Sequence, residues 1–296
     1  MAPDTTYLES LKRDGFVVIP NLLSGEKLSQ LRSACTETTK FARAGHWPHV
    51  RTLPKQFPPW NPTPGGNPAA EGIWGVQFLM HPAQPNHELF TQQYFAADVL
   101  EIVKGLLQCG DADLVMELYN LLVRPDHDFE LRWHRDSIAW EATAEEELQR
   151  LNEPAWHAQW NMALYDDASL IVVPGSHARA KTEAERAAQP FAKDMPGQLV
   201  VQMKAGDAVF YNNNIVHRGV YDSSVERMTL HGSMGHMNGS ELRARNVLQH
   251  GMREWIADVD LGVVPEGAER ERAGAMRERL VELGKVTGDV GFELEE

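Results

Sequence analysis

His134 and Asp136 lie two residues apart in a segment that reads as extended. Side chains alternate between the two faces of a strand, so this imidazole and this carboxylate are expected to point the same way. His217, far downstream, offers a third ligand. Two histidines and one carboxylate on one face of an octahedron are the ligand set of non-haem Fe(II) sites, because three positions stay open for co-substrate and oxygen.

Arg227 follows His217 by ten residues, a spacing that allows a hairpin to return its guanidinium to the same cavity. Thr229 is two residues further along and shares a strand face with Arg227. This Arg-x-Thr pair suits one end of a dicarboxylate, because a guanidinium matches a carboxylate with two hydrogen bonds and stays charged. An H-x-D pair by itself occurs more often without a metal than with one, so the assignment depends on the rest of the chain.

Further short segments surround these residues in a definite order. They are LKRDGFVVIPNLLS at 11–24, the H-x-D pair, ALYDD at 163–167, VPGSH at 173–177, AGDAVF at 205–210, and His217 with Arg227. In this order and spacing the chain resembles the phytanoyl-CoA dioxygenase family of Fe(II)- and 2-oxoglutarate-dependent oxygenases, from about Tyr7 to about Met237. The loop at 167–170 is shorter than in many family members and lacks their Asn-Gly pair, which affects the loop and none of the metal ligands.

The resemblance implies an all-β core with α decoration, a double-stranded β-helix (jelly-roll, cupin-like) barrel flanked by helices. It implies that His134, Asp136 and His217 hold Fe(II), and that 2-oxoglutarate chelates the iron and meets Arg227 and Thr229 with its far carboxylate. With O2, such an enzyme oxidises a small organic molecule by hydroxylation, desaturation, epoxidation or ring formation, releasing succinate and CO2, in some members within secondary metabolism. Halogenases of this type replace the carboxylate ligand, so Asp136 speaks against halogenation.

The chain is expected to form one domain with a helical part over about 1–112, a jelly-roll core over about 113–237 and a helical extension over about 238–296. A strand is predicted over 114–123, and within it Asn120 is expected to face the cavity and bind the co-substrate. A slip of one residue would reverse that assignment. Residues 141–152 predict an acidic, solvated helix, and residues 247–256 and 267–283 predict two more helices. The last has a narrow apolar stripe that suits either the barrel or a second copy of the chain, so a homodimer stays open.

Residues 45–82 are rich in proline and glycine, which rules out long regular elements there. The segment is either a lid over the iron site or a rigid loop packed on the barrel, and its aromatic residues Trp47, Phe57, Trp60, Trp74 and Phe78 fit both interpretations. Candidate substrate residues are Trp133, Trp140, Tyr119, Met234, His236 and Trp74. They indicate a partly apolar small molecule, although aromatic residues near a barrel also build its core.

The chain has 28 basic and 42 acidic residues and a formal charge of −14, which argues against nucleic acid as a partner. Two cysteines do not make a disulfide framework, and neither a signal peptide nor a membrane-spanning run is recognisable, so a cytoplasmic location without a membrane partner is expected. Two other functions stay open: a metal-dependent isomerase or hydrolase that uses the same three ligands with Zn or Mn, and a non-catalytic metal- or ligand-binding protein.

Overall fold

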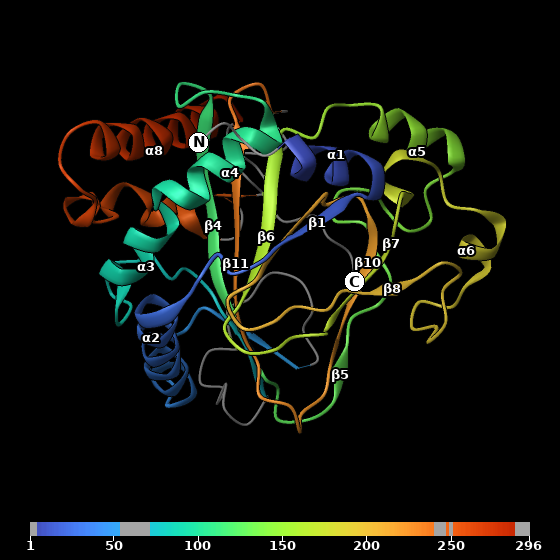
Figure 1. Ribbon diagram of the computed structural model, residues 1–296, viewed down its shortest axis with the longest axis horizontal. Coiled ribbons are helices and arrows are strands. Elements are labelled where there is room, and N and C mark those ends of the chain that lie inside the picture. Colours follow the sequence, from blue (N-terminus) through green and yellow to red (C-terminus); the bar gives the residue numbers. More distant parts are fainter. Residues whose placement is uncertain (1–4, 54–71, 240–246, 249–250, 288–296) are drawn as a thin grey trace.

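Two antiparallel β-sheets form the centre of the computed structural model, which describes residues 5–53, 72–239, 247–248 and 251–287 (Figure 1). In spatial order the larger sheet contains β1 (Phe16–Ile19), β9 (Ala208–Tyr211), β6 (His157–Ala163), β11 (Met228–His236), β4 (Leu114–Val123), β3 (Ile73–Val76) and β2 (Val50–Thr52). The smaller sheet contains β5 (Phe129–Glu130), β10 (Val216–Tyr221), β7 (Leu170–Val173) and β8 (Leu199–Val200). The predicted jelly-roll class is confirmed, as two separate sheets and not as one closed barrel.

Helices cover the outside of this β core. Against the larger sheet lie α2 (Gly25–Arg43), α3 (His87–Tyr94), α4 (Ala97–Leu107) and α8 (Ala268–Thr287), while α1 (Thr5–Asp14) contacts β1 and α4. Beyond the smaller sheet lie α5 (Ala144–Leu151) and α6 (Glu183–Ala187) (Figure 1). Short 3-10 turns occupy Ser176–Ala178, Met252–Glu254, Ile256–Asp258 and Leu261–Val263. None of the described helices combines the length and apolar character that crossing a membrane requires.

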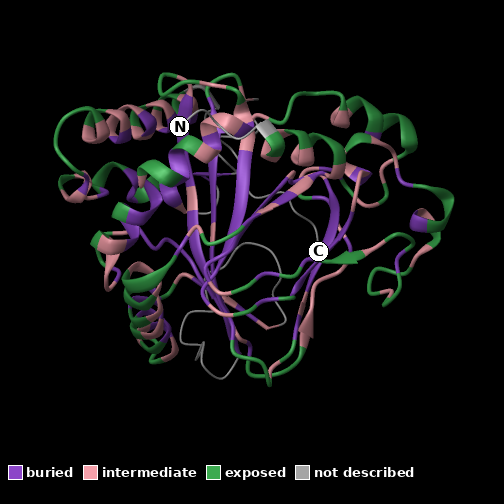
Figure 2. Cartoon of the chain, in the orientation of Figure 1, coloured by how far each residue is buried: buried purple, intermediate pink, exposed green. Residues whose placement is uncertain are grey.

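The two faces of the larger sheet have different tasks. Leu230 and Met234 of β11 point to the helices and are fully buried, as the strands in Figure 2 are along most of their length. Burying one such side chain contributes about 1.5–3 kcal/mol. Thr229 and His231 alternate with them and face the smaller sheet. This second face, here called the inner face, carries the polar side chains of the site.

The larger sheet begins earlier in the chain than the core boundary expected at about residue 113. Within the proline-rich stretch, Val50–Thr52 and Ile73–Val76 pair as edge strands and join β4, because proline excludes long helices but permits short edge strands. Trp47 and Phe78 lie buried in the core beside the helices, so they are not parts of a lid. Phe57 and Trp60 lie outside the described residues.

The strand predicted over 114–123 is confirmed, and α8 confirms the last predicted helix. Met276 and Leu280 of α8 are buried, and the helix contacts β4, so its stripe packs on the sheet of its own chain. The prediction of a helix over 247–256 is wrong in its second half, where 3-10 turns follow one another. The acidic helix is present as α5, but it is not merely solvated, because its Glu147 is fully buried.

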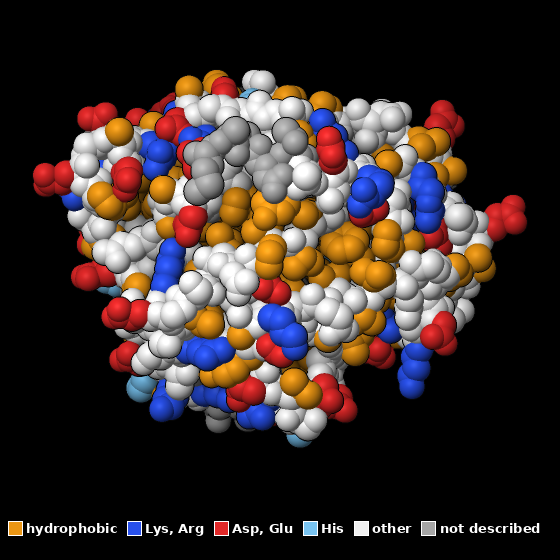
Figure 3. Space-filling model, in the orientation of Figure 1, with side chains coloured by type: hydrophobic (Ala, Val, Ile, Leu, Met, Phe, Trp, Pro, Cys, Tyr) orange, Lys and Arg blue, Asp and Glu red, His pale blue; other side chains and the backbone are white. Residues whose placement is uncertain are grey.

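Surface charge on the face drawn in Figure 3 is mixed. Asp and Glu side chains alternate with Lys and Arg around a central group of hydrophobic side chains, and the described residues of this face form no continuous basic patch. A protein that binds a polyanion needs such a patch to neutralise phosphates.

Candidate metal centre

The structure brings His134, Asp136 and His217 together between the two sheets. His134 and His217 pair across the strand ends through two backbone hydrogen bonds of 3.0 Å. Oδ1 of Asp136 lies 3.4 Å from Nε2 of His134 and 3.5 Å from Nε2 of His217. Ligand atoms about 2 Å from a metal lie roughly 3 Å apart at neighbouring octahedral positions. The three side chains therefore fit one face of a metal octahedron.

Hydrogen bonds set the proton positions of both imidazoles. Nδ1 of His134 donates to the carbonyl of Arg132, and Nδ1 of His217 donates to the carbonyl of Ile215, both over 2.8 Å. A neutral imidazole with its proton on Nδ1 presents an unprotonated Nε2, the form that ligates a metal. Gln159 donates to Oδ2 of Asp136 over 3.0 Å, which leaves Oδ1 facing the imidazoles. The donor set thus meets the chemical demands of a metal ion as well as the geometric ones.

The titration of these groups favours the ligating forms. Burial, and then the neighbouring His134, lower the pKa of His217 to about 4, so the imidazole is neutral at pH 7. Burial alone would raise the pKa of Asp136, but His217, His134 and Gln159 outweigh it, and the net pKa lies well below the ordinary value. An ionised carboxylate at Asp136 and a neutral imidazole at His217 are therefore ready at neutral pH.

Arg135, between the two ligands of the H-x-D pair, anchors the segment. Its side chain donates to the carbonyls of Ser176 over 2.9 Å and Arg179 over 3.0 Å, and also to that of Asn214. Its guanidinium Nε lies 3.5 Å from Oε1 of Glu147, and both side chains are almost fully buried. Because His134 and Asp136 flank it, this anchoring fixes where the ligands point. Sequence reasoning missed Arg135, although a charged residue between two inward ligands must point to the opposite side of the strand.

Glu147 of α5 is the centre of a buried cluster of charges. Lys181 lies 3.6 Å from Oε1, Arg186 bonds Oε2, and the backbone N–H of Lys181 donates to Oε2 over 2.9 Å. Together with Arg135, three cations thus surround one carboxylate that has no exposed surface. A buried charge of this kind is stable only with its partners, which makes α5 a support of the ligand segment.

Arg227 reaches the space between the sheets from the start of β11. Its Nε donates to Oδ2 of Asp167 over 2.7 Å and to Oγ of Ser169 over 3.0 Å, and its Cζ lies 4.5 Å from the centre of the Tyr221 ring. Thr229 donates to the same Asp167 oxygen over 3.2 Å. Among the described residues, the buried Nη1 of Arg227 has no hydrogen-bond partner. The guanidinium thus keeps a donor for one more acceptor, as binding of a carboxylate requires.

Asn120 lies on the inner face, opposite His231 of β11. Its Oδ1 accepts the backbone N–H of Phe78 over 2.9 Å. Its Nδ2 is buried and has no partner within the described part of the chain. Asn120 and Arg227 therefore each offer an unused donor to a polar molecule between the sheets, and Asp167 and Ser169 are members of this site that sequence reasoning did not find.

Three of the predicted substrate residues face away from the metal centre. Tyr119, Met234 and His236 lie on the outer face of the larger sheet, because each sits an odd number of positions from an inner-face residue of its strand. Tyr119 contacts Tyr94 of α3, with ring centres 5.3 Å apart. The prediction that they line the site is wrong, since they belong to the layer beneath the helices.

Trp133 and Trp140 also lie outside the space between the sheets. Trp133 is fully buried beneath Arg218, whose Cζ lies 5.0 Å from its ring, and Trp140 lies beneath the ammonium group of Lys181. The prediction that Trp133 and Trp140 contact the substrate is therefore wrong, and both residues have structural roles. Trp74 is different, because its ring lies 5.8 Å from that of Tyr221, the residue over which Arg227 stacks.

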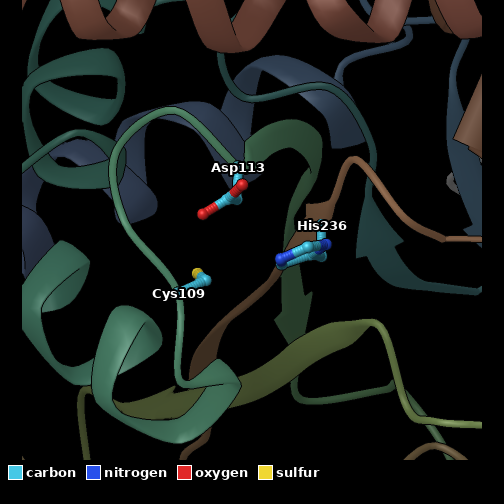
Figure 4. A group of neighbouring side chains, drawn as sticks. All are labelled: Cys109, Asp113 and His236. Carbon is cyan, nitrogen blue, oxygen red and sulfur yellow. The ribbon is translucent and has the colours of Figure 1, made fainter.

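Cys109, Asp113 and His236 form a second convergent cluster, shown in Figure 4. Nδ1 of His236 accepts the backbone N–H of Asn238 over 3.0 Å, which is the reverse of the arrangement in the metal centre. A ring nitrogen that accepts a hydrogen bond carries no proton, so the ring proton is on Nε2, which is then a donor and not a ligand. Burial, and then Asp113, raise the pKa of Cys109 to about 11, so the thiol stays protonated. The three side chains lie where the segment after α4 meets the start of β4 and the end of β11, which are joined by the backbone hydrogen bond from Met237 to Asp113 over 2.7 Å.

A cavity of about 210 Å³ lies beside the ligand segment. Ser137, Trp156, His157 and Asn213 are among the residues that line it, and the three metal-binding candidates are not. Asn213 nevertheless supports the site, because its carbonyl accepts the backbone N–H of Asp136 over 2.9 Å. The cavity is thus separate from the metal position.

His231 is an inner-face residue that the sequence did not single out. Its Nδ1 lies 2.8 Å from Oδ1 of Asn161, and burial, followed by the charge of Arg51, lowers its pKa to about 3. The unfolded chain, with a histidine pKa of about 6.5, takes up this proton first as the pH falls. The free energy of unfolding therefore has its full value above about pH 6.5. It falls as the pH drops from there towards pH 3, because over this range the unfolded chain is protonated and the folded His231 is not.

We expect the free energy of unfolding to fall by about 2 kcal/mol between pH 7 and pH 5 through His231 alone. Urea unfolding of the wild type and of His231→Phe at both pH values checks this. The variant should lose correspondingly less stability over the interval. Equal losses in the two proteins would exclude His231 as the source.

Comparison with known proteins agrees with the fold. The family model for phytanoyl-CoA dioxygenase (PhyH) matches residues 11–227. The crystal structure of EctD from S. alaskensis with 2-oxoglutarate and 5-hydroxyectoine has a TM-score of 0.56 and 17% sequence identity, covering 78% of this chain and 76% of EctD. HygX from Streptomyces hygroscopicus with nickel and 2-oxoglutarate bound has a TM-score of 0.56 at 16% identity, over 79% of this chain and 88% of HygX.

AviO1 from Streptomyces viridochromogenes Tue57 has a TM-score of 0.55 at 17% identity, over 79% of this chain and 96% of AviO1. At these identities the three likenesses establish a common fold and no more. Among curated proteins, none matches this chain by sequence.

Proposed function

This chain belongs to the phytanoyl-CoA dioxygenase family, and from that premise we propose that it is an Fe(II)- and 2-oxoglutarate-dependent oxygenase of a small organic molecule. The observation that carries the proposal is the pairing of a three-residue metal-binding face with the unused buried donor of Arg227. A metal hydrolase or isomerase needs the first of these but has no use for the second. The co-substrates are 2-oxoglutarate and O2, and the metal ligands are His134, Asp136 and His217.

The bound iron and 2-oxoglutarate would supply the oxidising chemistry, with succinate and CO2 as co-products. The protein's own residues bind and orient the reacting molecules, and they exclude water from the site. Arg227 binds the carboxylate of 2-oxoglutarate that lies far from the metal, and Asp167 holds the guanidinium in place from the other side. Asn120 Nδ2 donates a further hydrogen bond to the same molecule. Gln159 holds Asp136 so that its ligating oxygen keeps its direction.

Arg227→Lys tests this assignment. Lysine keeps a positive charge beside Asp167, so the buried carboxylate still has a cationic partner. Lysine lacks the planar guanidinium that can pair with a second carboxylate. We expect the dissociation constant of 2-oxoglutarate to rise at least about tenfold, the range for losing a hydrogen bond to a charged group. The measurement is calorimetric titration of the metal-loaded protein under anaerobic conditions.

Metal binding in the absence of 2-oxoglutarate should stay within about twofold of the wild type. This control separates loss of the co-substrate contact from collapse of the centre. If Arg227→Lys binds 2-oxoglutarate as the wild type does, Arg227 is not its carboxylate partner and the proposal loses its main support.

A further inference from the structure

Arg51 places a second cation on the inner face of the larger sheet. It pairs with Gly75 of β3, Gly75 pairs with Leu122 of β4, and Leu122 pairs with Thr229 of β11. Residues directly opposite each other on neighbouring strands share a face. Arg51 therefore lies on the same face as Thr229, whose side chain reaches Asp167.

Gly75 determines the course of the Arg51 side chain. A Cβ at position 75 would meet Cδ of Arg51 at 3.0 Å and its Cβ and Cγ at 3.2 Å. The missing side chain thus leaves a channel in which the alkyl chain of Arg51 lies, and the guanidinium ends 5.3 Å from the centre of the Trp74 ring. The Trp74 ring in turn lies 5.8 Å from that of Tyr221, so the half-buried guanidinium lies on the side of the smaller sheet. Burial lowers the pKa of Arg51 to about 10, and the group stays charged at pH 7.

His231 lies on the same face and offers a hydrogen-bond acceptor, whereas Arg51 offers donors. Its Nδ1 donates to Oδ1 of Asn161 over 2.8 Å, which leaves Nε2 as an acceptor. Within β11 it is partly accessible, whereas its neighbours Leu230 and Gly232 are buried. The charges of Arg51, Asp136 and Arg227 all act on this imidazole. A cationic donor and a neutral acceptor therefore lie together beside the metal centre.

We infer that Arg51 and His231 form a second carboxylate-recognition site, which selects a substrate that carries a carboxylate next to an O–H or N–H donor, as in a hydroxy acid or an amino acid. This inference rests on the proposed function, because it assumes that 2-oxoglutarate occupies Arg227. The guanidinium binds the carboxylate, and Nε2 of His231 accepts the neighbouring hydrogen.

The acceptor on His231 distinguishes the substrate from 2-oxoglutarate as the source of that carboxylate. The carboxylate of 2-oxoglutarate near the metal adjoins a ketone, which has no hydrogen to donate. The unused donor of Arg227 is assigned to the far carboxylate of 2-oxoglutarate, so the two arginines have different tasks.

The test uses the full chain loaded with Zn(II) and saturating 2-oxoglutarate, and it measures saturation-transfer NMR signals of three probes. Lactate has both groups, propionate lacks the hydroxyl, and lactamide lacks the charge. We expect lactate to bind at least about tenfold more tightly than lactamide, the range for losing a hydrogen bond to a charged group, and also more tightly than propionate.

Arg51→Gln should abolish the preference for lactate over lactamide, and Arg51→Lys should restore part of it. His231→Phe should abolish the preference for lactate over propionate. The matched control is Arg32→Gln, which removes an arginine stacked 4.7 Å over Tyr165 on the outer side of the fold and should leave both preferences unchanged.

If Arg51→Gln does not fold, the three probes measured on the wild-type protein still test the inference. Equal binding of lactate and lactamide to the wild type overturns it. It is also overturned if the preferences survive in Arg51→Gln, or if that variant weakens only 2-oxoglutarate. If the Zn-loaded wild type gives no signal transfer to 2-oxoglutarate itself, the proposed function fails instead, so the two failures are distinguishable.

Discussion

His217→Ala is expected to bind no measurable Fe(II) and to lose all 2-oxoglutarate turnover. Substitution of partners that only orient a metal ligand already costs about 10–100-fold in affinity, so removal of a ligand costs more. His217 also pairs with His134 through two backbone hydrogen bonds, which the variant keeps. The fold should therefore survive while the metal face loses one of its three donors. Metal analysis after anaerobic loading and desalting measures the result.

Cys109→Ala is the matched control for this prediction. It removes one member of the cluster of Cys109, Asp113 and His236, whose imidazole has its proton on the wrong nitrogen for a metal. This variant should retain iron and turnover at wild-type levels. Iron retention in His217→Ala together with iron loss in Cys109→Ala would show that iron binds at the cluster with Cys109 and not at the cluster with His217.

Glu147→Ala should destabilise the protein by about 3–5 kcal/mol, the range for removing one partner of a buried ion pair. The change leaves Arg135, Lys181 and Arg186 close together without their shared carboxylate. Because Arg135 lies between His134 and Asp136, the affinity for iron should fall as well. Urea unfolding and metal titration measure the two effects.

Glu145→Ala is the control, since Glu145 lies in the first turn of the same helix and is exposed. Its effect should stay within about 0.5 kcal/mol, as for most surface substitutions. Equal stability of the two variants would contradict the structural role given to Glu147.

Alternation along the strands explains which parts of the site could be predicted. The two-residue spacing of His134 and Asp136 and that of Arg227 and Thr229 place each pair on one face, and the structure has them there. The same rule, carried on from Thr229, places His231 on the inner face and Met234 on the outer one. The prediction that Met234 and Tyr119 line the site is wrong because the same alternation places both side chains on the outer face.

Long-range pairing explains what could not be predicted. Arg51 reaches the inner face only because β2 and β3 add to the edge of β4, and nothing local in a proline-rich stretch indicates that pairing. The contacts of Asp167 with Arg227 and of Glu147 with Arg135 join residues 60 and 12 positions apart. Their charges are visible in the sequence, but their burial is not, and burial is what makes them supports of the site.

The central claim, that this chain binds iron and 2-oxoglutarate at one centre, is tested most directly by anaerobic titration of the apo-protein with Fe(II) and then with 2-oxoglutarate, followed by visible absorption. We expect a weak charge-transfer band that needs both additions, is absent in His217→Ala and requires more 2-oxoglutarate in Arg227→Lys. Iron binding without any such band would contradict the claim, and the three ligands would then belong to a metal enzyme that has no use for 2-oxoglutarate.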